Sequence, residues 1–260
     1  MKKLLYIFLF LFSIIYVNAQ FDTEHWIAPF ADKTGGNGAD QYLYLSTNKT
    51  TPFKVSIYNN NTLYNTVQIS KGSPAKVYIS RDLMITSDNT QKFIKSKMGL
   101  HLVGEKKFFA HFRFSVPSHA EIITSKGKAG LGNEFYAFTP ANNAARGNAN
   151  STVGLIASED NTIITLDHFN DVTLSNNEAV STTTVKSITL NKGESYILDK
   201  YDGLFSVKTN QEIKSQDSIY FTKDMKKIKW TYFTVGDNED QSKNLRKKAN
   251  QIIDSLQKNQ

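Results

Sequence analysis

The sequence predicts an all-β protein of two tandem antiparallel β-sandwich units, followed by a C-terminal amphipathic helix. Three observations support this prediction: short runs in which polar and apolar residues alternate, a repeated order of strands and turns, and a late switch to helical spacing. Cysteine is absent, so the fold is expected to depend on core burial, and thiolate chemistry is excluded.

The chain opens with a segment typical of a secretory signal peptide. Two lysines precede an apolar run from Leu4 to Val17, and Val17-Asn18-Ala19 supplies small residues for cleavage. The run of about 14 residues is shorter than the ~20 that span a bilayer, which argues against the alternative of a membrane anchor. We therefore expect residues 1–19 to be removed, leaving an exported chain that begins at Gln20 and has no integral membrane segment.

The positive charge is concentrated near the end of the chain. The formal net charge is +7, but residues 20–207 carry 18 basic and 17 acidic side chains. Residues 208–260 carry 11 basic and 7 acidic side chains, so they form a basic tail. The main body therefore lacks the broad cationic surface that nucleic-acid binding requires, and no nucleic-acid partner is expected.

Strands are expected where apolar and polar side chains alternate over four to seven residues. The runs are Tyr42–Leu45, Phe53–Tyr58, Lys76–Ile79, Phe108–Phe114, Ala120–Thr124, Val153–Ala157, Thr162–Leu166, Val185–Leu190 and Ser195–Leu198. Clusters of Asn, Gly, Ser and Lys separate them and indicate turns. Many short strands at this spacing are typical of antiparallel sandwiches.

An internal sequence repeat divides the strands into two units. In each half a strand, a polar turn and a second strand are followed by a Lys-Gly turn, at Lys71-Gly72 and again at Lys192-Gly193. The repeat distance of about 110 to 121 residues is the length of one sandwich unit. We therefore predict one unit at 20–116 and a second at 117–207.

The tail switches to helical spacing. Leu245, Ala249, Ile252 and Leu256 recur at the interval of one helix face, which predicts a helix at about 238–258. Asp237 is positioned to cap its start. The stripe contains neither Trp nor Phe, which favours packing onto the β-body over docking on a membrane.

A glycine-rich stretch, SKGKAGLGNEF at 125–135, does not have the features of a phosphate site. A dinucleotide loop needs G-x-G-x-x-G before a helix, whereas this order is G-x-x-G-x-G before an alternating strand. Without a helix N-terminus there is no dipole to hold a phosphate. We expect a hairpin or sheet-crossing loop whose glycines supply positive φ.

Several stretches together resemble one known family. They are HWIAPF from His25, DQYLYLSTNKTTPFKVSI from Asp40, HAEIITSKGKAGLGNEF from His119, ASEDNTIITL from Ala157 and LNKGESYIL from Leu190. In this order they resemble the IgGFc-binding-protein N-terminal domain family, as found in surface proteins of gliding Bacteroidetes with type IX secretion sorting domains. The likeness covers residues 24–205. It implies an all-β extracellular module with a binding or adhesive role, and it supplies no catalytic residues.

The chain departs from the family pattern after about Val207. The further β-sandwich repeats expected of the family give way to a Lys-rich strand and the helical tail, and no β-rich sorting domain follows. A truncated or rearranged member is the corresponding expectation.

No motif in the chain predicts a catalytic or metal site. The five histidines show no H-E-x-x-H or H-x-H spacing, and there is no G-x-S-x-G elbow. His111 and Arg113 share one strand face, which we expect to be solvated, and His25 and Trp26 are expected to pin the N-terminal segment to the sandwich. The acidic cluster at 158–162 indicates a turn and lacks calcium-loop spacing. No metal and no cofactor are expected.

The best candidate for ligand contact is the loop from Phe138 to Thr152. It has no apolar period and is bounded by two predicted strands, so a rigid scaffold presents it. Its side chains combine amide donors and acceptors with one forked cation. The residues are Asn142, Asn143, Arg146, Asn148 and Asn150. A tolerated insertion without function is the alternative reading of this loop.

These observations favour an exported, non-enzymatic binding or adhesion module, extracellular or at the cell surface. The expected partner is a protein or glycan, because abundant Tyr and Asn suit both kinds of ligand. Two alternatives stay open. One is a secreted carbohydrate-active hydrolase, which would need two carboxylates about 5 to 10 Å apart in a cleft. The other is a periplasmic structural or assembly component.

Overall fold

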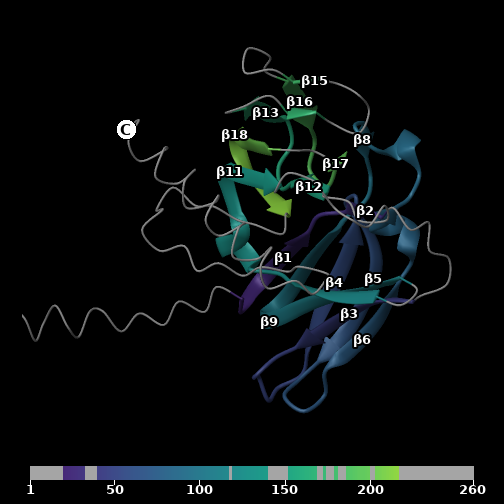
Figure 1. The fold of residues 1–260 in the computed structure, drawn as a ribbon. Helices are drawn as coiled ribbons and strands as arrows, with labels where there is room; N and C mark the ends of the chain where they lie inside the picture. Colours follow the sequence, from purple (N-terminus) through teal and green to yellow (C-terminus); the bar gives the residue numbers. More distant parts are fainter. Residues whose placement is uncertain are drawn as a thin grey trace, which may run out of the picture.

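The computed structural model describes residues 20–32, 40–116, 119–139, 152–168, 172–173, 179–180, 186–199 and 203–216. In these ranges the chain forms β-strands and three short 3₁₀ segments, and no α-helix (Figure 1). The all-β prediction is confirmed for this part of the chain. The predicted signal peptide at 1–19 and the predicted helix at 238–258 lie outside it.

The first sheet has seven strands in the order β5-β4-β9-β3-β6, with β1 and β10 also paired to β9. All of these pairs are antiparallel. Their bounds are β1 (Asp22–Ile27), β3 (Gln41–Ser46), β4 (Phe53–Asn59), β5 (Thr62–Ile69), β6 (Ala75–Ile79), β9 (Leu100–Val116) and β10 (His119–Thr124).

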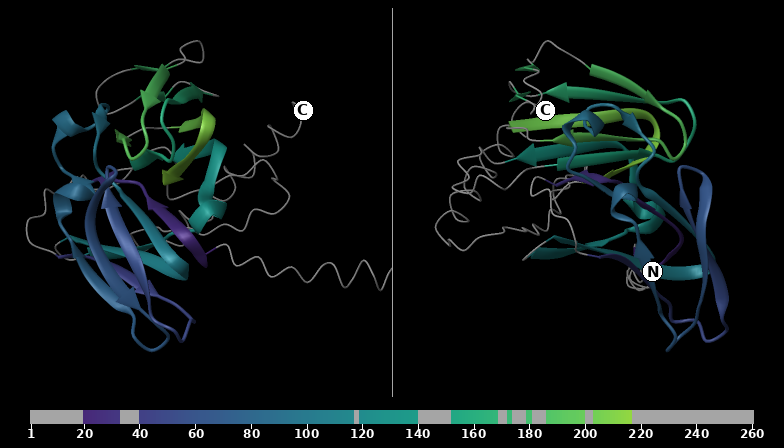
Figure 2. Two further views of the ribbon diagram at one scale, coloured as in Figure 1. Left: turned by 180° about the vertical axis from the view of Figure 1, so that it is seen from behind. Right: turned by 90° about the vertical axis from the view of Figure 1, so that its right-hand side faces the viewer.

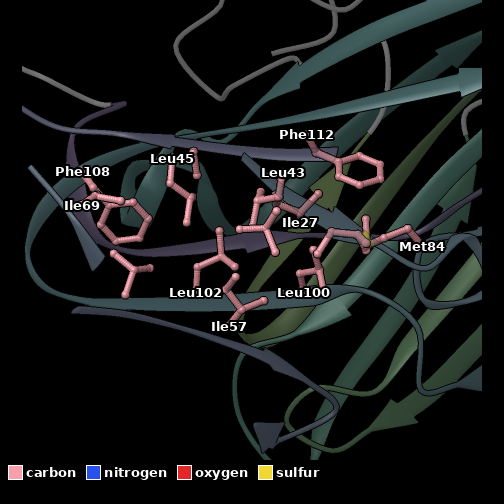
Figure 3. Packing of buried hydrophobic residues seen from close by; sticks show 14 of the residues in the cluster. Ile27, Leu43, Leu45, Ile57, Ile69, Met84, Leu100, Leu102, Phe108 and Phe112 are labelled. Carbon is pink, nitrogen blue, oxygen red and sulfur yellow. The ribbon is translucent and has the colours of Figure 1, made fainter. Parts of the chain in front are cut away.

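The 17-residue strand β9 contributes to both layers into which this sheet folds. Residues from His101 to Gly104 pair with β4, whereas residues from Phe109 onward pair with β3 and β10. Side chains from both ends of the strand order share a single core, so the sheet curls over itself (Figure 3). Burial of each large apolar side chain stabilises the fold by about 1.5–3 kcal/mol. Labelled members of this core include Leu43, Leu45, Ile57, Ile69, Leu100, Leu102, Phe108 and Phe112.

The second sheet also has seven strands, in the order β16-β13-β18-β12-β17-β8, with β11 paired to β18. Their bounds are β8 (Lys95–Ser96), β11 (Leu131–Thr139), β12 (Thr152–Ala157), β13 (Thr162–His168), β16 (Lys186–Leu190), β17 (Ser195–Asp199) and β18 (Gly203–Gln216). A separate pair, β14 (Val172–Thr173) and β15 (Ala179–Val180), forms a two-stranded ribbon. Strand β18 continues past residue 207, where the sequence analysis ended the second unit.

The connection between β6 and β9 joins the two sheets. It contains η1 (Arg81–Leu83), β7 (Ile85–Thr86), η2 (Asn89–Gln91) and β8, and its strand β7 pairs in parallel with β2 (Phe30–Ala31). Strand β8 lies within residues 20–116 but pairs with β17 of the second sheet. Beside it, the Tyr196 hydroxyl donates to the Phe93 carbonyl at 2.7 Å, and the Phe93 N–H donates to the Ile197 carbonyl at 2.9 Å.

The two sheets meet along β1 and the residues that follow it. Figure 2 shows the green strands of the second sheet stacked against the first, with purple β1 between them. Trp26, Ala28 and Ile156 are buried together at this boundary. The Pro29 carbonyl lies so close to Gly154 that a Cβ built there would be 1.8 Å from its oxygen. We call this contact region, from Trp26 to Pro29 against β12, the junction.

Candidate functional site

The predicted ligand-binding residues Asn142, Asn143, Arg146, Asn148 and Asn150 lie outside the described part of the chain. The strands that bound their loop are present as expected, since β11 ends at Thr139 and β12 begins at Thr152. The role of the loop therefore stays a prediction, and the geometry below concerns two other clusters of polar side chains.

The glycine-rich stretch forms a connection between β10 and β11, as the sequence predicts. Its short 3₁₀ segment, η3 (Gly127–Gly130), lies against β1. Gly127 has a φ of +59°, and a Cβ at this position would lie 2.5 Å from the Cβ of Asp22. The Asp22 carboxylate accepts the Lys128 N–H at 2.9 Å. The loop's backbone donor at Lys128 is therefore used by a carboxylate of the protein itself.

A second cluster, which we call the junction cluster, surrounds Glu24 on β1. Its Oε1 accepts hydrogen bonds from His101 Nε2 at 2.8 Å and from Trp26 Nε1 at 3.2 Å. Lys128 Nζ lies 3.5 Å from Oε2 of the same carboxylate. The His101 ring stacks on the Trp26 ring with 3.7 Å between ring centroids. Lys192, in the turn between β16 and β17, has its Nζ 6.0 Å from the centroid of the Trp26 ring.

Glu24 and His101 have the ionisation states of a structural hydrogen-bond network. Burial lowers the pKa of His101, and the Glu24 hydrogen bond only partly opposes that shift. Burial raises the pKa of Glu24, but the hydrogen bond from His101 and the nearby Lys128 hold it below its usual value. At neutral pH the pair is therefore a neutral imidazole donating to a carboxylate. His25 and Trp26 are both buried, so the expectation that they pin β1 to the sandwich is confirmed.

A third cluster lies on the outer surface of β3, β6 and β9, and we call it the tyrosine face. It consists of the outward side chains Tyr42, Tyr44, Lys76, Tyr78, His111 and Arg113. Their inward neighbours Leu43, Val77 and Phe112 are buried, which directs the alternate positions outward. His111 and Arg113 thus occupy the solvated strand face that the sequence predicts.

The rings of the tyrosine face are close enough to form one platform. Tyr42 lies 6.2 Å from Tyr78 and 6.4 Å from Tyr44 between ring centroids. Lys76 Nζ lies 3.8 Å from the centroid of Tyr42, a cation–π contact. The Tyr42 hydroxyl donates to Asp40 at 2.8 Å, and this hydrogen bond raises the pKa of the phenol. The Tyr42 phenol is therefore protonated at neutral pH.

Among the described residues, no three His, Asp or Glu side chains are grouped so that they could hold a metal ion. Within that same part of the chain, no helix is long and apolar enough to cross a membrane.

Comparison with known proteins finds a family match within the second half of the chain. Residues 121–222 match the family described as IgGFc binding protein. The match spans β10 through β18. Neither the curated proteins nor the solved structures include one that matches this chain.

The match of residues 121–222 to the family described as IgGFc binding protein supports an extracellular binding module. The matched region is shorter than the likeness read from the sequence, which extended back to residue 24. Strands β3 and β6, which carry most of the tyrosine face, precede the matched region, whereas the junction joins both parts.

The sequence alone does not single out the junction cluster or the tyrosine face. Glu24 and His101 are 77 positions apart, so no local spacing could indicate that they meet. The tyrosine face had a weak signal, because the tyrosines of Tyr42-Leu43-Tyr44 alternate with a core leucine in a predicted strand. That signal places the tyrosines outside but does not show that Tyr78 and Arg113 join them.

The buried histidines predict that the protein loses stability in mild acid. Burial lowers the pKa of His25 and of His101 below the usual value near 6.5. His25 donates from Nε2 to the Phe108 carbonyl, and its buried Nδ1 has no hydrogen-bond partner among the described residues. As the pH falls, these two histidines therefore become protonated at a higher pH in the unfolded chain than in the folded protein. The free energy of unfolding is expected to be constant above pH 7 and to decrease below about 6.5, by up to ~1.4 kcal/mol per pH unit for each such histidine.

Urea unfolding at pH 8, 7, 6 and 5 measures this dependence. A His101→Gln variant should be less stable at every pH but should show a shallower decrease between pH 6.5 and 5. A profile that is flat or rising toward pH 5 in the unmodified protein would contradict the assignment of neutral buried histidines.

Proposed function

We propose that this protein is an exported, non-enzymatic binding or adhesion module, secreted or displayed at the cell surface, that contacts its ligand through the tyrosine face. The observation that carries the proposal is the platform of Tyr42, Tyr44 and Tyr78 on the outside of the first sheet. Its rings stand on paired strands, so their positions are fixed before a ligand arrives.

The composition of the tyrosine face is that of a recognition surface. Tyrosine and arginine are enriched at the centres of binding interfaces, because they offer a large contact area and a hydrogen-bonding end at low entropic cost. Here the phenols lie beside Lys76 and Arg113. Tyr78 is 51 % exposed, which is more than a core or packing role requires.

A binding role fits the described carboxylates better than a glycoside-hydrolase role. A hydrolase needs one carboxyl group with a raised pKa to serve as the acid, beside a second carboxylate. On β1 both Asp22 and Glu24 have lowered pKa values, because their hydrogen bonds and nearby cations outweigh the effect of burial. Burial does raise the pKa of Glu121 on β10. The residue paired with it on β9 is Phe114, however, so this pairing does not supply the second carboxylate.

The loop between β11 and β12 is the competing location for the same function. Its Asn142, Asn143, Arg146, Asn148 and Asn150 could contact sugar hydroxyls or a polar protein surface. A variant in which a short Gly-Ser turn replaces 141–150 and a variant with Tyr44→Ala and Tyr78→Ala separate the two locations. The tyrosine change is expected to leave the melting temperature nearly unchanged, because Tyr44 and Tyr78 are not buried. The same is expected of the loop change, because a polar loop without an apolar period is predicted to add little to the core.

A combined glycan and host-protein array, probed with the protein expressed without residues 1–19, tests the proposal. We expect at least one ligand, loss of its binding in the double tyrosine variant, and retained binding in the loop variant. Loss in the loop variant alone would place the site on the loop. An array without any ligand would overturn the binding role and favour the structural or assembly alternative.

We further propose that the module consists of two copies of one structural unit in tandem. Supporting this, the first sheet runs β5-β4-β9-β3-β6 and the second runs β16-β13-β18-β12-β17, which is the same order by position in each half. The Lys-Gly turns also correspond. Gly72 and Gly193 have φ values of +83° and +79°. In each turn the backbone N–H of the lysine donates to the preceding polar turn: Lys71 to the Lys49 carbonyl at 2.6 Å, and Lys192 to the Asp160 carboxylate at 3.0 Å.

A further inference from the structure

The tyrosine face carries an excess of positive charge. Lys76 and Arg113 belong to it, and neither forms an ion pair with a described residue. Lys126 is exposed beside its edge, and after burial it is the second cause that lowers the pKa of His111. The nearby carboxylate is Asp40, which accepts the hydrogen bond of Tyr42. Among the described residues named here, three cations, Lys76, Arg113 and Lys126, therefore lie at the rings together with one carboxylate, that of Asp40.

The pairing register arranges these groups in two parallel rows across four strands. Residues that are directly paired across antiparallel strands lie on the same face. One row runs Tyr78, Tyr42, Arg113 and Ile122, and the next runs Lys76, Tyr44, His111 and Thr124. Each row places a phenol ring directly beside a cation, Tyr42 beside Arg113 in the first and Tyr44 beside Lys76 in the second, so a ligand on the strands meets an aromatic surface and a positive charge at neighbouring positions.

The rim of the platform extends onto β5. The Tyr64 hydroxyl donates to the carbonyl of Tyr78 at 3.3 Å, so a fourth phenol lies at the β6 edge. Tyr64 is 39 % exposed, and Ile122 at the opposite end of the first row is 56 % exposed. The surface is therefore accessible from the β5 edge to β10.

We propose that the ligand of the tyrosine face is an acidic polysaccharide, a chain of sugar rings that bear carboxylate groups. This inference rests on the proposed function and names the class of ligand for that site. The C–H faces of sugar rings pack on phenol rings, and the phenol hydroxyls bind sugar hydroxyls. Lys76, Arg113 and Lys126 then pair with the carboxylates, Arg113 as a bidentate partner.

A protein partner fits this surface less well. Stable protein interfaces have a desolvated apolar centre from which charged residues are depleted. At the centre of this face, Lys76 Nζ lies 3.8 Å from the ring centroid of Tyr42, and Lys76 is paired with Tyr44 in the register. The exposed aliphatic residue Ile122 lies on β10 at its end, so the apolar centre of a protein interface is missing from these rows.

Binding of the protein, expressed without residues 1–19, to alginate, a polyuronate, tests the proposal by biolayer interferometry. A neutral glucan and poly-glutamate are the comparison probes. We expect alginate to bind at least tenfold more tightly than either one, and raising the salt from 50 to 500 mM to weaken it severalfold because the charges are exposed. Lys76→Glu and Arg113→Glu should each weaken binding about three- to tenfold, and Tyr44→Ala should weaken it at both salt concentrations.

Lys54→Glu is the matched control, since Lys54 is exposed on β4 of the same sheet but away from the tyrosine face. It should change the affinity less than twofold. Equal binding of the neutral glucan, or equal binding of poly-glutamate, would overturn the acidic-polysaccharide proposal. So would failure of alginate to bind while an array protein binds through the same tyrosines, an outcome that leaves the proposed function intact. Failure of every probe and every array ligand would overturn both.

Discussion

Replacing Gly154 with alanine is expected to lower the free energy of unfolding by about 3 kcal/mol or more. The new Cβ would lie 1.8 Å from the Pro29 carbonyl oxygen and 3.0 Å from its carbon, and backbone atoms cannot rotate away as a side chain could. Pro29 is itself confined, because its Cδ would lie only 3.3 Å from a Cβ built at Gly99. The junction would therefore have to open. Thermal unfolding should show a decrease in melting temperature of roughly 6–12 °C.

Gly72→Ala is the control for this substitution. Gly72 has a φ of +83° but nothing within 4 Å of its added Cβ, so only backbone strain of about 1 kcal/mol is expected. If Gly154→Ala costs no more than Gly72→Ala, the close approach of β12 to the Pro29 segment is not present in solution.

Truncation of Trp26 is the second change with a large expected effect. Trp26→Ala should cost about 3–5 kcal/mol, because its side chain is 1 % exposed and packs at the junction with Ala28 and Ile156. The change also removes the ring that stacks on His101 and the indole N–H that donates to Glu24. Urea unfolding followed by circular dichroism measures the loss.

Trp26→Phe separates packing from hydrogen bonding at this position. Phenylalanine keeps an apolar ring but lacks the indole N–H, so we expect it to recover more than half of the stability that alanine loses. A loss below 1 kcal/mol for Trp26→Ala would show that β1 is not anchored between the sheets.

Much of the fold follows from local alternation in the sequence. In strands such as Phe53–Asn59 the buried side chains occur at every second position, and that pattern is visible without a structure. The polar turns are equally local, because Asn161 and Gly193 adopt positive φ where the sequence places Asn and Gly.

Long-range pairing could not be predicted in the same way. Strand β8 has only two residues, and its assignment to the second sheet depends on partners at Ser195 and Tyr196, about 100 residues later. The bend in β9 is also invisible, since Leu100–Val116 reads as one strand although its two parts serve different layers. These features depend on how the sheets curl and pack, which no window of neighbouring residues encodes.

The candidate site was partly predictable. Alternation places Tyr42, Tyr44 and Lys76 on exposed strand faces, but their gathering with Arg113 requires the β6-β3-β9 order. The sequence instead favoured the loop with Asn142 and Arg146, because a long aperiodic segment is a common location for function.

Oxidative footprinting by mass spectrometry tests most directly whether the tyrosine face binds the ligand. The protein is oxidised by hydroxyl radicals with and without the strongest ligand from the array, and modification is quantified for each side chain. We predict that bound ligand protects Tyr44 and Tyr78, while Leu63 on β5 and Ile163 on β13, which are 55 % and 45 % exposed, stay as reactive as in the free protein. Protection confined to residues 140–151, with Tyr44 and Tyr78 unchanged, would contradict the account.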